Sequence, residues 1–162
     1  IPLVLERMPG VKFVYAGDPH VVYEKFFQRW QGLLEAYRSH VVMLGLITDR
    51  QKLADFYAMC DVFALPSRTD CFPSVQIEAM LCGTPVVATN IPGAREVVSV
   101  TGMGLLVEPG DEGTLTEGLL RVLADRNGYV RSYEQIRSVF NTEVTISAYE
   151  HLLQSLIPRG RE

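Results

Sequence analysis

The sequence has no long hydrophobic segment. Its longest apolar run, 41-VVMLGLI-47, is far below the roughly 18 residues that a membrane-spanning helix needs. Residues 1–10, IPLVLERMPG, lack the basic and then apolar order of a secretory signal. These absences argue against a membrane-spanning or secreted protein, and we expect a soluble, cytoplasmic one.

An excess of basic charge is also missing. Lys and Arg number 15 against 19 Asp and Glu, so that the net charge is −4, and the pI is about 5.4. The basic residues are scattered rather than gathered in a stripe, which leaves no electrostatic footprint for nucleic acid. We therefore expect no nucleic-acid partner.

Cysteine and histidine are scarce. The three cysteines lie eleven residues apart, which matches no zinc spacing, and an odd number does not pair fully into disulfides: Cys60, Cys71 and Cys82. We expect small, buried, apolar thiols in a reducing compartment. His20, His40 and His151 have no carboxylate, Ser or Cys companion at a readable spacing, so each is expected on the surface or in the core. The sequence predicts no metal site.

What the chain does have is enough apolar material for one core. It has 162 residues, of which 48% are hydrophobic, and its mean hydropathy is +0.12. This predicts one compact domain over residues 1–157, followed by a frayed tail at 158–162. Because the sequence begins at Ile1 without a Met, we expect it to be a piece of a longer protein.

Five short apolar runs alternate with stretches of helical period. They are 11-VKFVYAG-17, 40-HVVMLGL-46, 61-DVFALP-66, 85-PVVAT-89 and 104-GLLVEP-109. Short buried runs that alternate with helices indicate a parallel sheet covered on both faces. The sequence therefore predicts an α/β fold, an open doubly wound parallel sheet of about five strands, which binds ligands at the carboxyl ends of its strands.

The segments between the runs predict helices. One covers 23–37, where an apolar stripe at steps of three and four residues indicates core packing: Tyr23, Phe26, Phe27, Trp30, Leu33, Leu34 and Tyr37. Thr48 with Gln51 predicts a capping box for the next helix. Another is expected to have Ser74 as its N-cap and to end at Gly83 and Pro85. A short helix then precedes 104–109, and two more cover about 111–124 and 144–157.

Two carboxylates flank the start of the helix at Ser74. Asp70 lies in the loop after the run 61–66, and Glu78 lies four residues into the helix, about 6 Å along its axis. Free N–H groups and the positive end of the dipole at a helix start favour a diphosphate. Carboxylates accept hydrogen bonds in pairs, which suits vicinal hydroxyls of a sugar or ribose. The spacing equally fits a turn-forming Asp and a solvated helix Glu.

A second polar position follows the first run. Asp18 in 15-YAGDPH-20 comes directly after Gly17 at the predicted carboxyl end of a strand, where a ligand of a doubly wound sheet binds. An Asp before Pro is also commonly a turn former. Both interpretations, site residue and turn former, remain open for Asp18.

A long motif surrounds Asp70 and Glu78. The stretch 66-PSRTDCFPSVQIEAMLCGTPVVATNIPGAREVV-98, with 57-YAMCDVFAL-65 before it and 102-GMGLLVEPGD-111 after it, closely resembles the carboxyl-terminal domain of group 1 retaining glycosyltransferases of the GT-B fold. Its parts are an acid, seven residues, Glu-Ala-Met, Cys-Gly-Thr-Pro-Val-Val-Ala-Thr, and Gly-x-x-Glu at Gly93 and Glu96. Nearly the whole chain fits the order of elements in that domain.

The resemblance implies a donor site for a nucleoside-diphosphate sugar, a UDP-sugar or a GDP-sugar. Glu78 would hold the ribose hydroxyls, and Asp70, where the family usually has Glu, would face the transferred sugar; these two are the expected catalytic pair. The segment 43-MLGLITDRQKL-53 resembles the loop that packs on the nucleobase, although Lys52 also fits a solvated helix residue. The remaining donor-binding residues that it implies are Cys71, Phe72, Pro73, Ser74, Ile47, Lys52, Gly17, Asp18 and Gly93.

The resemblance also implies a hexosyltransferase that retains anomeric configuration by same-face attack, in polysaccharide or glycolipid biosynthesis, with no metal or other cofactor. The first strand of that domain, its basic loop, and the amino-terminal domain that binds the acceptor are absent from this sequence. We expect the fragment alone to be inactive, the acceptor to be bound elsewhere, and any peripheral membrane association to depend on the absent parts.

Three other functions compete with this interpretation. A nucleotide-sugar 2-epimerase has the same fold and donor contacts, and a non-catalytic nucleotide-sugar sensor needs only this domain. A dinucleotide-dependent oxidoreductase is disfavoured, because 102-GMG-104 leads into a strand and no complete G-x-G-x-x-G opens a helix.

Overall fold

The five predicted strands are present in the computed structural model, which describes residues 1–18 and 26–156. They are β1 (Phe13–Tyr15), β2 (Val41–Met43), β3 (Phe63–Leu65), β4 (Val86–Thr89) and β5 (Gly104–Val107). Every pairing between them is parallel. The α/β, Rossmann-like class predicted from the sequence is confirmed, although each strand is shorter than the apolar run that contains it.

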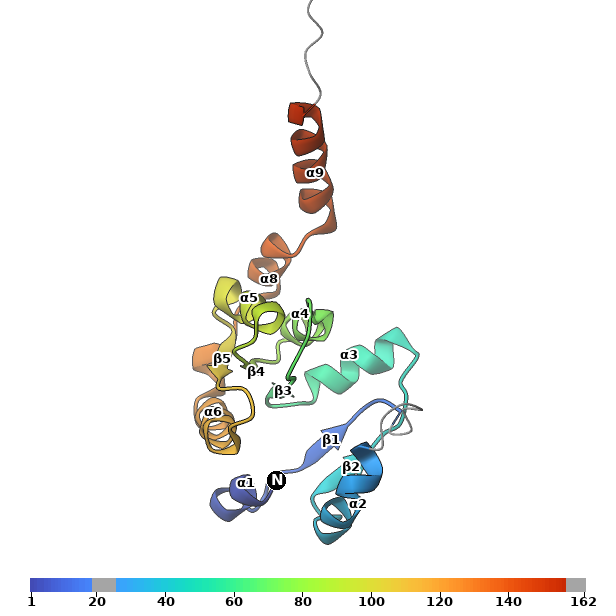
Figure 1. Cartoon of the computed structure of the whole chain (residues 1–162), viewed down its shortest axis with the longest axis vertical. Coiled ribbons are helices and arrows are strands. Elements are labelled where there is room, and N and C mark those ends of the chain that lie inside the picture. The colour runs from blue at the N-terminus through green and yellow to red at the C-terminus, as the bar shows by residue number, and fades with distance from the viewer. Residues whose placement is uncertain (19–25, 157–162) are drawn as a thin grey trace, which may run out of the picture.

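The strands form two hydrogen-bonded sheets rather than one. β1 pairs with β2, and β3, β4 and β5 follow one another in that order. In register, Val14 lies opposite Val42, and Val87 lies opposite both Ala64 and Leu105. Figure 1 shows the β1–β2 pair beside α2 and the three-stranded sheet among α4, α5 and α6. The expectation of a single continuous sheet is thus corrected, because no ladder joins β1 to β3.

Helices connect and follow the strands. They are α1 (Pro2–Arg7), α2 (Phe26–Ala36), α3 (Arg50–Ala58), α4 (Ser74–Leu81), α5 (Pro92–Thr101), α6 (Glu112–Ala124), α7 (Arg126–Tyr129), α8 (Tyr133–Val139) and α9 (Thr142–Leu156). The sequence predicted neither α7 nor α8. No helix in the described ranges is both long and apolar enough to cross a membrane.

The core lies on both faces of the central strand β4, all of whose residues are buried. Val86 and Ala88 pack in a cluster with α4 and α5, whereas Val87 packs in a second cluster with α1 and α6. This alternation follows from the two-residue period of a strand. It places α4 and α5 on one face of the three-stranded sheet and α1 and α6 on the other.

Two predicted helix caps are each wrong by one residue. α3 is capped by Asp49, whose Oδ1 accepts the Lys52 N–H at 2.9 Å, and not by Thr48. Asp is a stronger N-cap than Thr, and Gln51 bonds to Asp55 instead of closing a capping box. The N-cap position of α4 is Pro73, so Ser74 is the first helical residue.

Two helices are less buried than their patterns suggest. Trp30 of α2 is 37% exposed, which contradicts the expected core packing of that residue, and the Arg29 guanidinium lies 5.5 Å from its ring centroid. Tyr23 and the side chains of residues 26 and 27 lie outside the described part, as does the predicted tail at 158–162. α9 has no buried residue, and Figure 1 shows it projecting from the rest of the molecule.

Candidate functional site

The loop between β3 and α4 is organised by Asp70. Its Oδ1 accepts the Phe72 N–H at 3.2 Å, a local turn that leaves both residues exposed. Pro73 has no N–H, and within the described ranges neither Phe72 nor Ser74 donates its N–H to a backbone oxygen. The predicted diphosphate-binding position therefore has two backbone amides, those of Phe72 and Ser74, and the Phe72 amide is already bonded to the Asp70 side chain.

Gly93 lies beneath this loop. It is buried in the first turn of α5, and a Cβ atom there would collide with the carbonyl oxygens of Asp70 and Cys71. Only glycine allows the two backbones to approach this closely. Gly93, which the resemblance placed among the donor-binding residues, thus supports the loop backbone from below.

Glu78 has two partners within the protein. Its Oε2 accepts the Tyr57 hydroxyl from α3 at 3.1 Å, and its Oε1 accepts the Ser74 hydroxyl, one helical turn earlier, at 3.3 Å. Tyr57 is only 4% exposed, so its hydroxyl needs such an acceptor. A carboxylate has about four acceptor positions. Glu78, which is half-buried, therefore fixes α3 to α4 and keeps acceptor capacity for a further ligand.

Burial raises the pKa of Tyr57 above its ordinary value, and the nearby Glu78 carboxylate raises it further. The phenol is therefore protonated at neutral pH and acts as the donor in the Tyr57–Glu78 bond. No functional role was predicted for Tyr57 from the sequence. The rule that a buried Tyr needs a hydrogen-bond partner was the available signal that it would contact a polar group.

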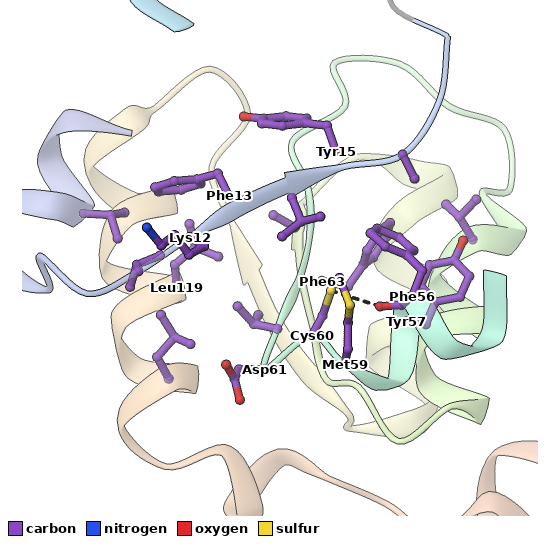
Figure 2. A pocket seen from close by; sticks show the side chains of 18 of the residues that line it. Lys12, Phe13, Tyr15, Phe56, Tyr57, Met59, Cys60, Asp61, Phe63 and Leu119 are labelled. Carbon is purple, nitrogen blue, oxygen red and sulfur yellow. Dashed lines mark hydrogen bonds between the residues drawn. The ribbon is translucent and has the colours of Figure 1, made fainter. Parts of the chain in front are cut away.

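A cleft of about 1210 Å³ separates β1 from β3 and α3. Figure 2 shows Phe13 and Leu119 on one side of it and Phe56, Tyr57 and Phe63 on another. Three predicted site residues line the cleft: Gly17, Ile47 and Glu78. The structure brings these three to one space, whereas the other predicted site residues lie outside the lining: Asp18, Lys52, Asp70, Cys71, Phe72, Pro73, Ser74 and Gly93.

The carboxyl ends of β1 and β2 are joined through glycine. Gly17 has φ +136° and donates its N–H to Gly45 O at 2.8 Å. Ile47, two residues after Gly45, is half-buried against the core cluster that contains Tyr57. Lys52 is exposed, and its backbone N–H is used in capping α3. Lys52 thus matches the solvated interpretation, and its side chain has no ion pair in the described ranges.

The cysteines are free thiols. Cys71, in the loop, is exposed, whereas Cys60 and Cys82 are only half-buried rather than fully buried as expected. Burial raises the pKa of both half-buried thiols, and the carboxylates Asp61 and Glu78 add to the effect at Cys60 and Cys82 respectively. In the part of the chain that the structure describes, no group of three or more Cys, His, Asp or Glu side chains is arranged to hold a metal ion.

The sequence itself matches a known family. The profile described as glycosyl transferases group 1 matches residues 1–125, most of the chain. The chain belongs to the group 1 glycosyltransferases. It is 30% identical over 123 residues to N-acetyl-alpha-D-glucosaminyl L-malate synthase of Bacillus anthracis, covering 74% of this chain and 32% of that protein. Over 85 residues it is 43% identical to D-inositol 3-phosphate glycosyltransferase 2 of Catenulispora acidiphila, covering 51% of this chain and 20% of that protein.

Solved glycosyltransferase structures have the same fold. Sucrose-phosphate synthase of Thermosynechococcus elongatus superimposes with a TM-score of 0.74 at 31% identity, over 94% of this chain and 40% of that one. HepE of Anabaena, solved in complex with UDP-glucose, gives a TM-score of 0.77 at 23% identity, over 96% of this chain and 45% of that one. The chain therefore spans less than half the length of these relatives.

Proposed function

We propose that this chain is the donor-binding domain of a retaining glycosyltransferase, which transfers a hexose from a UDP-sugar or GDP-sugar to an acceptor bound by another domain. The observation that carries the proposal is the position of Glu78. It lies on α4, which starts at the carboxyl end of β3, and it shares the lining of the cleft with Gly17 and Ile47. Ligands of doubly wound sheets bind at such strand ends.

The chemistry divides between the two carboxylates. Glu78 has lone pairs left after its bonds to Tyr57 and Ser74, and these suit the two ribose hydroxyls of the donor. Among the described residues, only the Oδ1 of Asp70 is engaged, by the Phe72 N–H, so Oδ2 is left for a hydroxyl of the transferred sugar. The Ser74 amide and the positive end of the α4 dipole stabilise the leaving diphosphate. No metal or protein nucleophile has a role in this scheme.

We also propose that the donor domain is completed by a strand that precedes α1 and lies between β1 and β3. Phe13 and Tyr15 hydrogen-bond toward β2, and Phe63 hydrogen-bonds toward β4. Since consecutive residues of a strand direct their N–H and C=O groups to opposite sides, Val14 and Ala64 present theirs to the cleft that both line. Two such edges facing one apolar space are suited to one more parallel strand. In this proposal the strand takes the part of the cleft between Val14 and Ala64, and the donor takes the end beyond the carboxyl ends of β1 and β2, which Gly17 and Ile47 line.

The position of α1 selects this place for the strand. α1 packs with α6 on the face of the sheet opposite to α4 and α5. β3 is connected to β4 through α4, and β4 to β5 through α5, so these right-handed crossovers run from β3 toward β5 with their helices on one face. α1 lies on the other face, so a right-handed crossover through α1 must run in the opposite direction across the sheet. A strand joined through α1 to β1 therefore lies on the β3 side of β1. Slow hydrogen exchange of the Val14 and Ala64 amides in a longer form of the protein, but not in this chain, tests the assignment.

Donor binding is tested by calorimetric titration of the full-length protein with UDP-glucose and GDP-glucose. We expect one of them to bind, and Glu78→Gln to weaken that binding roughly ten- to a hundredfold, because hydrogen bonds to a charged acceptor contribute about 1.5–3 kcal/mol. Glu150→Gln, an exposed Glu of α9, is the matched control. Binding of neither nucleotide sugar, or equal affinity in the Glu78→Gln variant, contradicts the proposal.

Transfer is tested in the full-length protein. Release of the nucleoside diphosphate that depends on an acceptor supports a transferase. Release of an epimerised sugar without any acceptor supports the 2-epimerase instead, and donor binding with no product under either condition supports a sensor.

A further inference from the structure

Two contacts hold the loop that carries Asp70, and the residue that makes the second contact lies outside the residues that the family match covers. Gly93 of α5 supports the carbonyls of Asp70 and Cys71. On the other side, the ring of Phe72 meets the ring of Phe140 edge-on, with centroids 6.3 Å apart and planes at 60°. Phe140 is the C-cap residue of α8, whereas the family match ends at residue 125.

α8 is firmly anchored and can act as a fixed support. Ser132 and Gln135 form a complete capping box at its start, and Ile136 is 1% exposed in the core cluster shared with α4 and α5. Phe140 donates its N–H to Ile136 O at 3.1 Å and packs its partly buried side chain against the same cluster. Phe72, by contrast, is 52% exposed on a loop, so Phe140 is the anchored member of the pair.

We propose that Phe140 is a positioning residue that fixes the loop from Asp70 to Ser74 through its contact with Phe72. At its end the loop is held by the buried Pro73 and by the Ser74 hydroxyl, which bonds to Glu78. At its outer side the Phe72 N–H bonds to Asp70, two residues earlier, and not to another element. Loss of the ring contact therefore releases the outer side of the loop while Gly93 still supports its base. The part of this inference that concerns donor affinity rests on the proposed function, and the part that concerns the loop does not.

Trypsin cleavage after Arg68, identified by mass spectrometry, measures the loop directly. Arg68 is exposed and lies just before Asp70, and native-state proteolysis follows the population of the opened segment. Phe140→Leu retains an apolar side chain but loses the edge-on ring pair, and we expect cleavage to rise about 2- to 10-fold. Phe140→Tyr retains the ring and should cleave like the wild type. Val139→Ala, an exposed neighbour in α8, is the control.

A double-mutant cycle separates positioning from general loss of packing. If the rings act as a pair, Phe72→Leu and Phe140→Leu each raise cleavage, and the double variant cleaves no faster than the faster single variant. Multiplied effects of the two substitutions, or cleavage in Phe140→Leu equal to that in Val139→Ala, overturn the inference.

Donor titration of the same variants gives the second readout. Phe140→Leu is expected to weaken nucleotide-sugar binding by a factor similar to its effect on cleavage, with Phe140→Tyr restoring it. If the two substitutions are coupled in the cleavage assay but the wild-type full-length protein binds no donor, Phe140 is upheld as a loop-positioning residue and the proposed function alone is refuted. If Phe140→Leu is cleaved faster but binds the donor as tightly as a wild-type protein that does bind it, the link between the loop position and donor binding is overturned.

Discussion

Replacing Glu78 by Ala is expected to destabilise the fold as well as weaken donor binding. The substitution leaves the Tyr57 hydroxyl, in a residue that is 4% exposed, without its acceptor. An unpaired buried hydroxyl costs about 1–3 kcal/mol, whereas the exposed Ser74 hydroxyl can bond to water instead. In a chain of this length each kcal/mol shifts the Tm by about 2–4 °C. Glu78→Gln retains one acceptor oxygen and similar helix propensity, so its cost is about 1 kcal/mol or less.

Urea unfolding followed by circular dichroism measures these differences. Glu150→Ala, at an exposed position of α9, is the control for replacing a helical Glu. In the double variant Tyr57→Phe/Glu78→Ala the unpaired hydroxyl is gone, so it should lose less stability than the sum of the two single variants. Equal free energies of unfolding for Glu78→Ala and Glu150→Ala, or strict additivity in the cycle, would refute a structural role for the Tyr57–Glu78 bond.

Three further predictions follow from the contacts described above. Gly93→Ala should cost about 1–3 kcal/mol of stability and abolish ordered placement of the loop, because its Cβ meets the Asp70 and Cys71 carbonyls; Gly32→Ala, with open space around it, is the control in the same unfolding assay. Because the folded-state pKa of Tyr57 is raised, its stabilising effect is fully present below the unfolded value of about 10 and is lost as the pH rises toward the folded value; alkaline unfolding should therefore be steeper in the wild type than in Tyr57→Phe. Ile146→Gln with Leu153→Gln, on the exposed face of α9, should change the free energy of unfolding by less than about 0.5 kcal/mol while lowering the binding of a hydrophobic dye.

The agreement between sequence and structure is closest where one local rule acts alone. The apolar runs around Val14, Val87 and Leu105 are strands as predicted. The run around Val87 is buried throughout, and such a parallel strand needs nothing but continuous apolar residues. The helix starting at Ser74 and ending before Gly83 is also as predicted, apart from one residue at its cap. At Asp49 two adjacent cap formers compete. Cap preference alone ranks Asp49 above Thr48, but the capping-box spacing from Thr48 to Gln51 favoured the wrong residue.

The predicted site was only partly a property of the sequence. The family motif names Glu78 and Asp70, but the partners of Glu78 depend on α3 packing against α4, which brings Tyr57 within 3.1 Å. Likewise, nothing in the local sequence places Gly93 under the carbonyl of Cys71, since that contact requires α5 to start beneath the loop. The expectation that Trp30 packs in a core was wrong because an apolar stripe states only which side chains share a helix face.

By itself the sequence determined the strands, most of the helices and the family of this protein, because hydrophobic period, glycine and proline positions, and a long motif are all local features. Only the tertiary structure decided what those elements contact. It divided the strands into two sheets with an apolar cleft between Val14 and Ala64, joined Glu78 to Tyr57, and set Phe140 against Phe72. Such contacts join residues far apart in the chain, and their formation depends on the packing of whole helices and strands rather than on any local pattern.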